Sequence, residues 1–188
     1  MKREDIIHKT IKILNVGGSI LYPTDTVWGI GCDATNEEAV VKVFDIKQRS
    51  ESKSLIILVD SLEMLKQYID EIPCNIIKIL EKFHKPTTVI YKKPIGLANN
   101  VMASDNTVAI RVVQDKFCKE LIHQFGKPIV STSANISGKP TPKTFKEIEP
   151  SILDAVDYMV NLHRNKKTDS PSSIIKLNTK GEIEVIRA

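Results

Sequence analysis

The chain has 188 residues, 41% of them hydrophobic, and its 27 Lys and Arg residues against 23 Asp and Glu leave a formal net charge of +4. This length suits one domain, residues 1–188, and the composition is that of a globular protein rather than a disordered one. No stretch approaches the ~20 apolar residues that cross a bilayer, and the charged N-terminal segment lacks the apolar core of a signal peptide. We therefore expect a cytoplasmic protein with no membrane association.

Cysteine and histidine residues are few and dispersed. The cysteines are Cys32, Cys74 and Cys118, and no two of the four histidines lie at helical spacing. This pattern matches neither a disulfide framework nor a zinc ligand set. The sequence therefore predicts no metal site built from protein side chains.

Apolar periodicity and turn residues predict helices that alternate with short strands. The predicted helices cover 4–16, 36–47, 61–69, 73–83 and 116–125, and a further short helix is expected to begin with Thr144 and Glu147. Their predicted boundaries are Gly17-Gly18, capping boxes at Thr35/Glu38 and Asp60/Glu63, Pro73 in the first turn of a helix, the cap Asp115 and the stop Gly126. The predicted strands cover 19–22, 55–59, 87–91, 107–113, 128–131, 158–162, 173–177 and 183–187. This alternation indicates an α/β fold, and the closing hairpin favours a mixed sheet flanked by helices over a purely parallel one.

The charge is unevenly distributed along the chain. Residues 78–146 contain 12 basic and 4 acidic residues, a local net charge of +8, whereas the rest of the chain is net acidic. A basic region of this kind is typical of proteins that bind nucleotides, nucleic acids or phosphate. A solvated, lysine-rich surface explains the same pattern without any ligand.

One glycine motif matches the sequence pattern of a dinucleotide-binding fingerprint. Residues 29–34, Gly-Ile-Gly-Cys-Asp-Ala, match G-x-G-x-x-A. That motif requires a strand that runs directly into the glycines and a helix that opens within them. Here the expected strand ends at Tyr22 and the expected helix cap is Thr35, so we regard a nicotinamide or flavin site as a minor alternative.

Four other polar features are candidates for ligand binding, and each also has a purely structural explanation. Tyr22-Pro-Thr-Asp-Thr-Val-Trp-Gly29 holds two hydroxyls and a carboxylate at a strand end, or forms a turn closed on its own backbone. Lys47-Gln-Arg49 could clamp a phosphate, or its two cations could simply be favoured at the end of a helix by the helix dipole. Ser131-Thr-Ser-Ala-Asn-Ile-Ser-Gly138 offers donors to phosphate or ribose, or is a capping loop. Arg111, within an apolar strand, binds an anion or faces water on an edge strand.

In this order and spacing, with Pro171-Ser-Ser-Ile-Ile175 and a closing Ile186-Arg187, the motifs resemble the YrdC-like threonylcarbamoyl-AMP synthase family. The resemblance runs from about residue 10 to residue 187. It implies a twisted mixed sheet with flanking helices and the short, single-domain form of the family, without the extra C-terminal domain of longer members.

The resemblance also implies a reaction and its partners. L-threonine and bicarbonate or CO2 form a carbamate, which attacks the α-phosphorus of ATP to give threonylcarbamoyl-AMP and pyrophosphate. Mg²⁺ is expected to arrive with ATP, without protein ligands. Downstream threonylcarbamoyl-transferase proteins then modify tRNA, and the family is also associated with double-stranded RNA.

The site residues follow from the same resemblance. Lys47 and Arg49 are the implied catalytic residues, because they would hold the ATP phosphates. The implied ATP-binding set is Lys47, Arg49, Thr107, Ser133, Ala134, Asn135, Thr141 and Arg187. The implied L-threonine-binding set is Thr24, Arg111, Thr132 and Ser172.

The chain departs from the family pattern at a few positions. Ser50 and Ser54 stand where prolines are usual, Leu58 stands where some members have histidine, His84-Lys-Pro-Thr-Thr88 replaces W-P-G-P-[LM]-T, and Ser173 ends the usual Pro-Ser-Thr. These departures keep open a related ATP-dependent carbamoyl-adenylate enzyme with an altered substrate. A non-catalytic double-stranded RNA or tRNA-binding protein is the other alternative, although only 5% of the residues are aromatic, which disfavours base stacking as the sole role.

Overall fold

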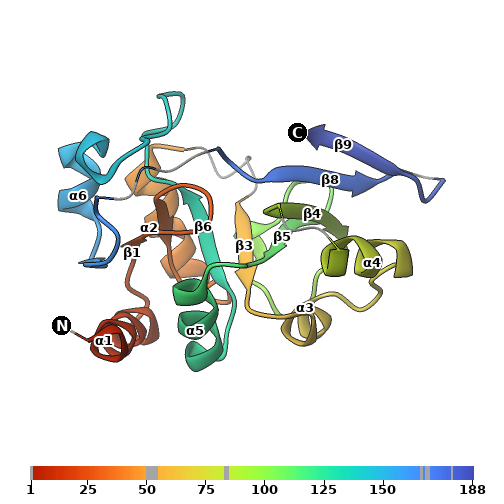
Figure 1. Cartoon of the computed structure of the whole chain (residues 1–188), viewed down its shortest axis with the longest axis horizontal. Coiled ribbons are helices and arrows are strands. Elements are labelled where there is room, and N and C mark those ends of the chain that lie inside the picture. Colours follow the sequence, from red (N-terminus) through yellow and green to blue (C-terminus); the bar gives the residue numbers. More distant parts are fainter. Residues whose placement is uncertain (1, 50–54, 83–84, 166, 168–169, 179) are drawn as a thin grey trace.

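A computed structural model describes residues 2–49, 55–82, 85–165, 167, 170–178 and 180–188. Within them the chain forms one nine-stranded sheet in the order β7-β1-β2-β6-β3-β5-β4-β8-β9 (Figure 1). The strands are β1 Ile20–Tyr22, β2 Gly29–Gly31, β3 Ile56–Val59, β4 Thr87–Lys92, β5 Thr107–Val112, β6 Ile129–Ser133, β7 Tyr158–Met159, β8 Ser173–Leu177 and β9 Ile183–Arg187.

Strand pairing confirms the predicted mixed sheet. Three pairs are parallel, β1–β7, β3–β5 and β4–β8, and the other neighbours are antiparallel. The closing hairpin of β8 and β9 is present as predicted. Strand β2 was not predicted, and β7 is shorter than the expected 158–162.

The helices are α1 Arg3–Asn15, α2 Glu37–Lys47, α3 Leu62–Tyr68, α4 Cys74–Lys82, α5 Lys116–Phe125 and α6 Pro150–Ala155, with 3-10 turns η1 Asn99–Val101 and η2 Phe145–Glu147. Helices α1, α3 and α5 lie along one side of the sheet (Figure 1). Their apolar faces are buried there, as at Phe117, Leu121 and Phe125 of α5, which is the packing that amphipathic periodicity predicts. Helix α6 and η1 were not predicted. The short helix expected to begin at Thr144 is only the 3-10 turn η2.

Two predicted helix caps are wrong by one residue. Asn36, not Thr35, caps α2, because the Thr35 hydroxyl and amide both donate to Asp33 Oδ1. Ser61, not Asp60, caps α3, since Asp60 Oδ1 accepts from the Ser61 hydroxyl. In both places a neighbouring side chain engages the expected cap residue and moves the helix start.

The end of α1 and both ends of α5 were predicted correctly, whereas the position of Pro73 was not. Asp115 caps α5 and Gly126 ends it in the left-handed conformation, with φ of 74°. Gly17, with φ of 69°, follows α1. Pro73 precedes α4 rather than lying in its first turn, because its carbonyl accepts from the amides of Ile76 and Ile77.

No helix within the described residues is long and apolar enough to span a membrane.

Candidate functional site

A cavity of about 390 Å³ opens on one face of the sheet, over β3, β4, β5, β6, β8 and β9. Its volume falls in the range of small-molecule sites, about 300–1,000 Å³. Apolar side chains line part of it, among them Ile56, Ile90 and Ala109. Its polar lining consists of Thr26, Arg49, Arg111, Ser131, Thr132, Ser133, Thr141, Ser172 and Arg187.

The structure brings most of the predicted site residues together at this cavity. The predicted ATP-binding residues that line it are Arg49, Ser133, Thr141 and Arg187, and the predicted threonine-binding residues are Arg111, Thr132 and Ser172. These residues come from six separate segments of the sequence. The remaining predicted residues, which do not line the cavity, are Thr24, Lys47, Thr107, Ala134 and Asn135.

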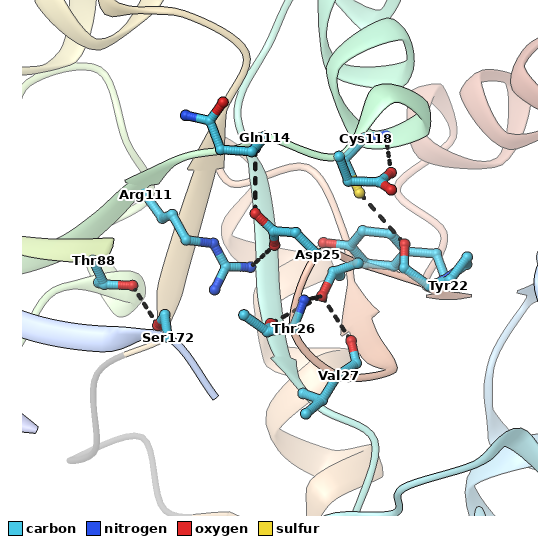
Figure 2. A network of polar contacts seen from close by, with 12 residues as sticks. Tyr22, Asp25, Thr26, Val27, Thr88, Arg111, Gln114, Cys118 and Ser172 are labelled. Carbon is cyan, nitrogen blue, oxygen red and sulfur yellow. Dashed lines mark hydrogen bonds and ion pairs between the residues drawn. The ribbon is translucent and has the colours of Figure 1, made fainter. Parts of the chain in front are cut away.

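Arg111 lies in β5, a central strand between β3 and β4, and only 3% of the residue is exposed. The edge-strand explanation for this arginine is therefore wrong. Its Nη2 forms an ion pair of 2.9 Å with Asp25 Oδ1, and Asp25 Oδ2 accepts from the Gln114 amide (Figure 2). Since a guanidinium carries five N–H donors, the Asp25 pair leaves donors that the cavity can use.

Thr24 closes a turn instead of facing the cavity. Its hydroxyl donates to the Val27 carbonyl at 2.7 Å and accepts from the Thr26 amide at 3.1 Å. This is a turn closed on its own backbone, which is the structural explanation of the Tyr22–Gly29 motif. The turn brings Thr26 to the cavity wall, and its position two residues after Thr24 in the same motif is the signal that could have identified it.

Lys47 is buried, with 1% of the residue exposed. Its ammonium donates to the carbonyls of Ser133 at 2.5 Å and Asn135 at 2.7 Å, and its own carbonyl accepts from the Ser137 amide. Burial and, next, the charge of Arg49 lower the pKa of Lys47 to about 8. Lys47 thus fastens the 133–137 loop to the end of α2, and its predicted contact with phosphate stays a prediction.

Arg49 reaches the cavity because α2 ends abruptly. Gln48 takes the left-handed conformation, with φ of 49°, and the Arg49 amide donates back to the Phe44 carbonyl at 3.0 Å. This 6→1 hydrogen bond is typical of a helix stop. The helix end therefore directs Lys47 into the protein and Arg49 to the cavity.

Ala134 and Asn135 shape the loop next to the cavity. The Ala134 amide donates to the Trp28 carbonyl at 2.9 Å, and Asn135 Nδ2 donates to the carbonyls of Ile136 and Lys139. Ser131, which was not predicted as a site residue, lines the cavity beside Ser133. Residues two apart on a strand share a face, so the Ser131-Thr-Ser133 run in β6 could have indicated it.

Thr107 lies at the start of β5, outside the cavity. Its hydroxyl donates to Asp105 Oδ1 at 2.6 Å, and the residue borders a second, wider hollow of about 1,150 Å³. It is two residues from Ala109 and four from Arg111, on the same face of the strand. Its predicted contact with the nucleotide remains a prediction.

Arg187, on β9, is fixed against Ser172. Its Nε donates to the Ser172 carbonyl at 2.9 Å, and its Nη2 donates to the Ser172 hydroxyl at 3.4 Å. Burial, followed by the charge of Arg111, lowers the pKa of Arg187, and burial also lowers that of Arg49. Burial therefore disfavours the charged form of Arg49 and Arg187. Together with Arg111 they place three guanidinium groups at one cavity, which makes a site for an anionic ligand.

The glycine motif has a structural role. Gly29–Gly31 form β2, which pairs with β1 and β6, and α2 begins only at Glu37. A Cβ on Gly31 would collide with the Val130 carbonyl and the Tyr22 ring. The minor dinucleotide interpretation is therefore wrong, because these glycines lie within a strand and do not open a helix.

Among the departures from the family pattern, Leu58 is fully buried and pairs with Arg111 in the register of β3 and β5. It is not among the residues that line the cavity. Ser173 begins β8, next to Ser172. Ser50, Ser54 and His84 lie outside the described residues.

Known proteins of one family are similar to this chain in sequence. A family model, Sua5/YciO/YrdC, described as "Telomere recombination", matches residues 12–188. The threonylcarbamoyl-AMP synthase of Vibrio parahaemolyticus is 34% identical over 173 residues, which are 90% of this chain and 93% of that protein.

Solved structures share the fold. Sua5 of P. abyssi, complexed with L-threonine, superposes with a TM-score of 0.87 at 26% identity, over 100% of this chain. The present chain spans only 54% of the length of that Sua5 chain. E. coli YciO, at 24% identity and a TM-score of 0.82 over 99% of this chain and 89% of its own, shows a likeness of fold alone.

Proposed function

The chain belongs to the Sua5/YciO/YrdC family, and on this premise we propose that it is an L-threonylcarbamoyladenylate synthase, a nucleotidyltransferase. It joins L-threonine, bicarbonate or CO2, and ATP into threonylcarbamoyl-AMP and pyrophosphate. The observation that carries the proposal is the convergence of Arg49, Arg111 and Arg187 with serine and threonine hydroxyls at one cavity. The similarity to curated threonylcarbamoyl-AMP synthases over nearly the whole chain supports it.

The chemistry needs little from the protein beyond position and charge. The α-amino group of threonine, as the neutral amine, bonds to the carbon of CO2 and releases one proton, which leaves an anionic carbamate. A carbamate oxygen then bonds to the α-phosphorus of ATP, the bond from that phosphorus to the bridging oxygen breaks, and pyrophosphate leaves. Such transfers depend on alignment and on neutralising negative charge, which is what arginines at the wall of a cavity provide.

Arg49 and Arg187 are our proposed phosphate ligands, and Ser133 and Thr141 complete the nucleotide side of the cavity. Lys47 supports that side through the loop that it holds. Arg111, Thr132 and Ser172 form the proposed threonine side, with Arg111 opposite the substrate carboxylate. Asp25 fixes the Arg111 guanidinium by an ion pair and leaves its remaining donors to the ligand.

Mg²⁺ belongs to the substrate MgATP in this proposal. Within the described residues no group of three or more His, Cys, Asp or Glu side chains could hold a metal ion. We propose that ATP phosphates and water are the ligands of Mg²⁺. The product would pass to threonylcarbamoyl-transferase proteins that modify tRNA in the cytoplasm.

The direct test is pyrophosphate release by the purified chain with MgATP, L-threonine and bicarbonate. We expect release that depends on all three substrates and that L-serine or glycine does not support at the same rate. Arg49→Met should lower it at least tenfold, since each charge-assisted hydrogen bond is worth about 1.5–3 kcal/mol. A folded wild-type chain that releases no pyrophosphate contradicts the proposal, whereas release with another amino acid supports the altered-substrate alternative.

A further inference from the structure

Ser172 has a buried partner behind it. The hydroxyl of Thr88, in β4, lies 2.8 Å from that of Ser172 (Figure 2). Thr88 is fully buried and Ser172 is 2% exposed. Ser172 lines the cavity, whereas Thr88 does not. Thr88 is therefore a residue behind the wall that contacts one of the residues in the wall.

The direction of this hydrogen bond can be deduced. Arg187 Nη2 donates to the Ser172 oxygen, because a guanidinium has no acceptor. If Ser172 donated to Thr88, the Thr88 proton would be buried without an acceptor among the hydrogen bonds of the described residues. If Thr88 donates, its proton has an acceptor. The Ser172 oxygen then accepts from both Thr88 and Arg187, and the Ser172 O–H can donate to a ligand in the cavity.

We infer that Thr88 is a positioning residue, which directs the Ser172 proton toward an anionic oxygen of the bound ligand. With the proposed function, on which this inference rests, that oxygen belongs to the carboxylate of L-threonine. Ser172 would then supply one donor to the carboxylate and Arg111 the countercharge. Thr88 itself touches no substrate.

Arg187 should stay in place without the Thr88 hydroxyl. Its shorter hydrogen bond goes to the Ser172 carbonyl, at 2.9 Å, which does not involve the Ser172 side chain. Removal of the Thr88 hydroxyl should therefore affect threonine binding and leave ATP binding nearly unchanged. This split separates positioning from a general loss of structure.

The test compares Thr88→Val, which keeps the branched shape and removes the hydroxyl, with Thr88→Ser, which restores it. We expect Thr88→Val to raise KM for L-threonine about three- to tenfold, the worth of one hydrogen bond, with KM for ATP and kcat within about twofold of wild type. Thr88→Ser should recover most of the loss. Calorimetric titration with L-threonine should show the same ratio.

Thr87→Val is the matched control. Thr87 is also buried in β4, but its hydroxyl donates to the Lys85 carbonyl at 2.9 Å and its side chain points to the opposite face of the strand. We expect its KM for L-threonine to equal that of wild type. The inference is overturned if Thr88→Val keeps the wild-type KM, if Thr88→Ser fails to rescue it, or if Thr87→Val raises it equally. A wild-type chain that neither binds L-threonine nor releases pyrophosphate contradicts instead the proposed function, and with it the ligand assigned to Ser172.

Discussion

The ammonium of Lys47 is buried, which is rare for a lysine, and it donates hydrogen bonds to two backbone carbonyls inside the protein. Sequence alone indicated a cation beside Arg49, but it could not tell which of the two would turn inward. That choice depends on the left-handed Gln48 at the end of α2. The sequence carries only a weak signal for such a conformation, because glycine and asparagine are the usual residues there.

Lys47→Met should destabilise the fold by about 2–4 kcal/mol, because two buried carbonyls lose their donor. Urea denaturation measures the change. Lys42→Met is the matched control, since Lys42 lies on the same helix but is exposed, and its ammonium donates to one carbonyl, that of Gly17. Equal effects of the two substitutions would contradict the structural role of Lys47.

A comparison of wild type with Lys47→Met also tests the lowered pKa of Lys47. The unfolded chain keeps this proton up to a pKa of about 10.4, whereas the folded chain loses it near pH 8. Between these values the unfolded state binds more protons, so this group makes stability rise with pH, and below pH 8 it adds no pH dependence. The stability difference between wild type and Lys47→Met should therefore grow from pH 8 to pH 10, and a constant difference would refute the lowered pKa.

The ion pair of Asp25 and Arg111 should also contribute to the stability of the fold. Arg111→Leu leaves the Asp25 carboxylate buried without its countercharge, which costs about 3–5 kcal/mol. Asp25→Asn/Arg111→Leu should recover much of that stability, since the buried charge is then gone. Thermal or urea unfolding of the four proteins in this cycle gives the coupling, and additive effects would mean that the pair is not formed.

Strand β2 shows how an element can escape sequence analysis. It has three residues, two of them glycines, which are depleted in strands, and no apolar alternation marks it. Its glycines are explained by the close approach of β1 and β6, which depends on tertiary packing and has no local sequence signal. The longer strands, with Val and Ile in runs, and the helices with clear apolar faces were predictable because their local signals agree with their burial.

Gly31→Ala should destabilise the protein by about 1–3 kcal/mol through overpacking, because its Cβ meets backbone of β6 that has no room to move. Gly29→Ala is the milder control, since its nearest neighbour is the Ser131 hydroxyl at 3.1 Å. Denaturant midpoints give the comparison. Should Gly31→Ala prove as stable as wild type, the close packing of β1, β2 and β6 would be wrong.

At the scale of the molecule, the order of motifs along the chain anticipated the cavity better than charge did. Of the arginines at the cavity only Arg111 lies within the basic 78–146 region, and Arg49 and Arg187 come from the net acidic remainder. Motif order could identify those three arginines. It could not distinguish residues that line the cavity from residues next to it, such as Thr24 and Asn135, because both kinds are polar and close in sequence.

The excess charge of residues 78–146 stays without an assigned role. Some of it is paired, as in Lys127 with Asp33 at 2.7 Å and Lys139 with Glu149 at 2.8 Å. RNA binding by this region remains a prediction, for which affinity should fall steeply as salt rises.

The central claim is that one cavity makes a threonine-derived adenylate. It is tested most directly with [¹³C]bicarbonate, L-threonine and MgATP, followed by mass spectrometry of the quenched reaction. We predict a single adenylate product that contains threonine and one ¹³C atom and that is lost in Arg49→Met. Pyrophosphate release without a ¹³C-containing adenylate, or a ¹³C-containing adenylate that forms in the absence of L-threonine, would contradict the claim.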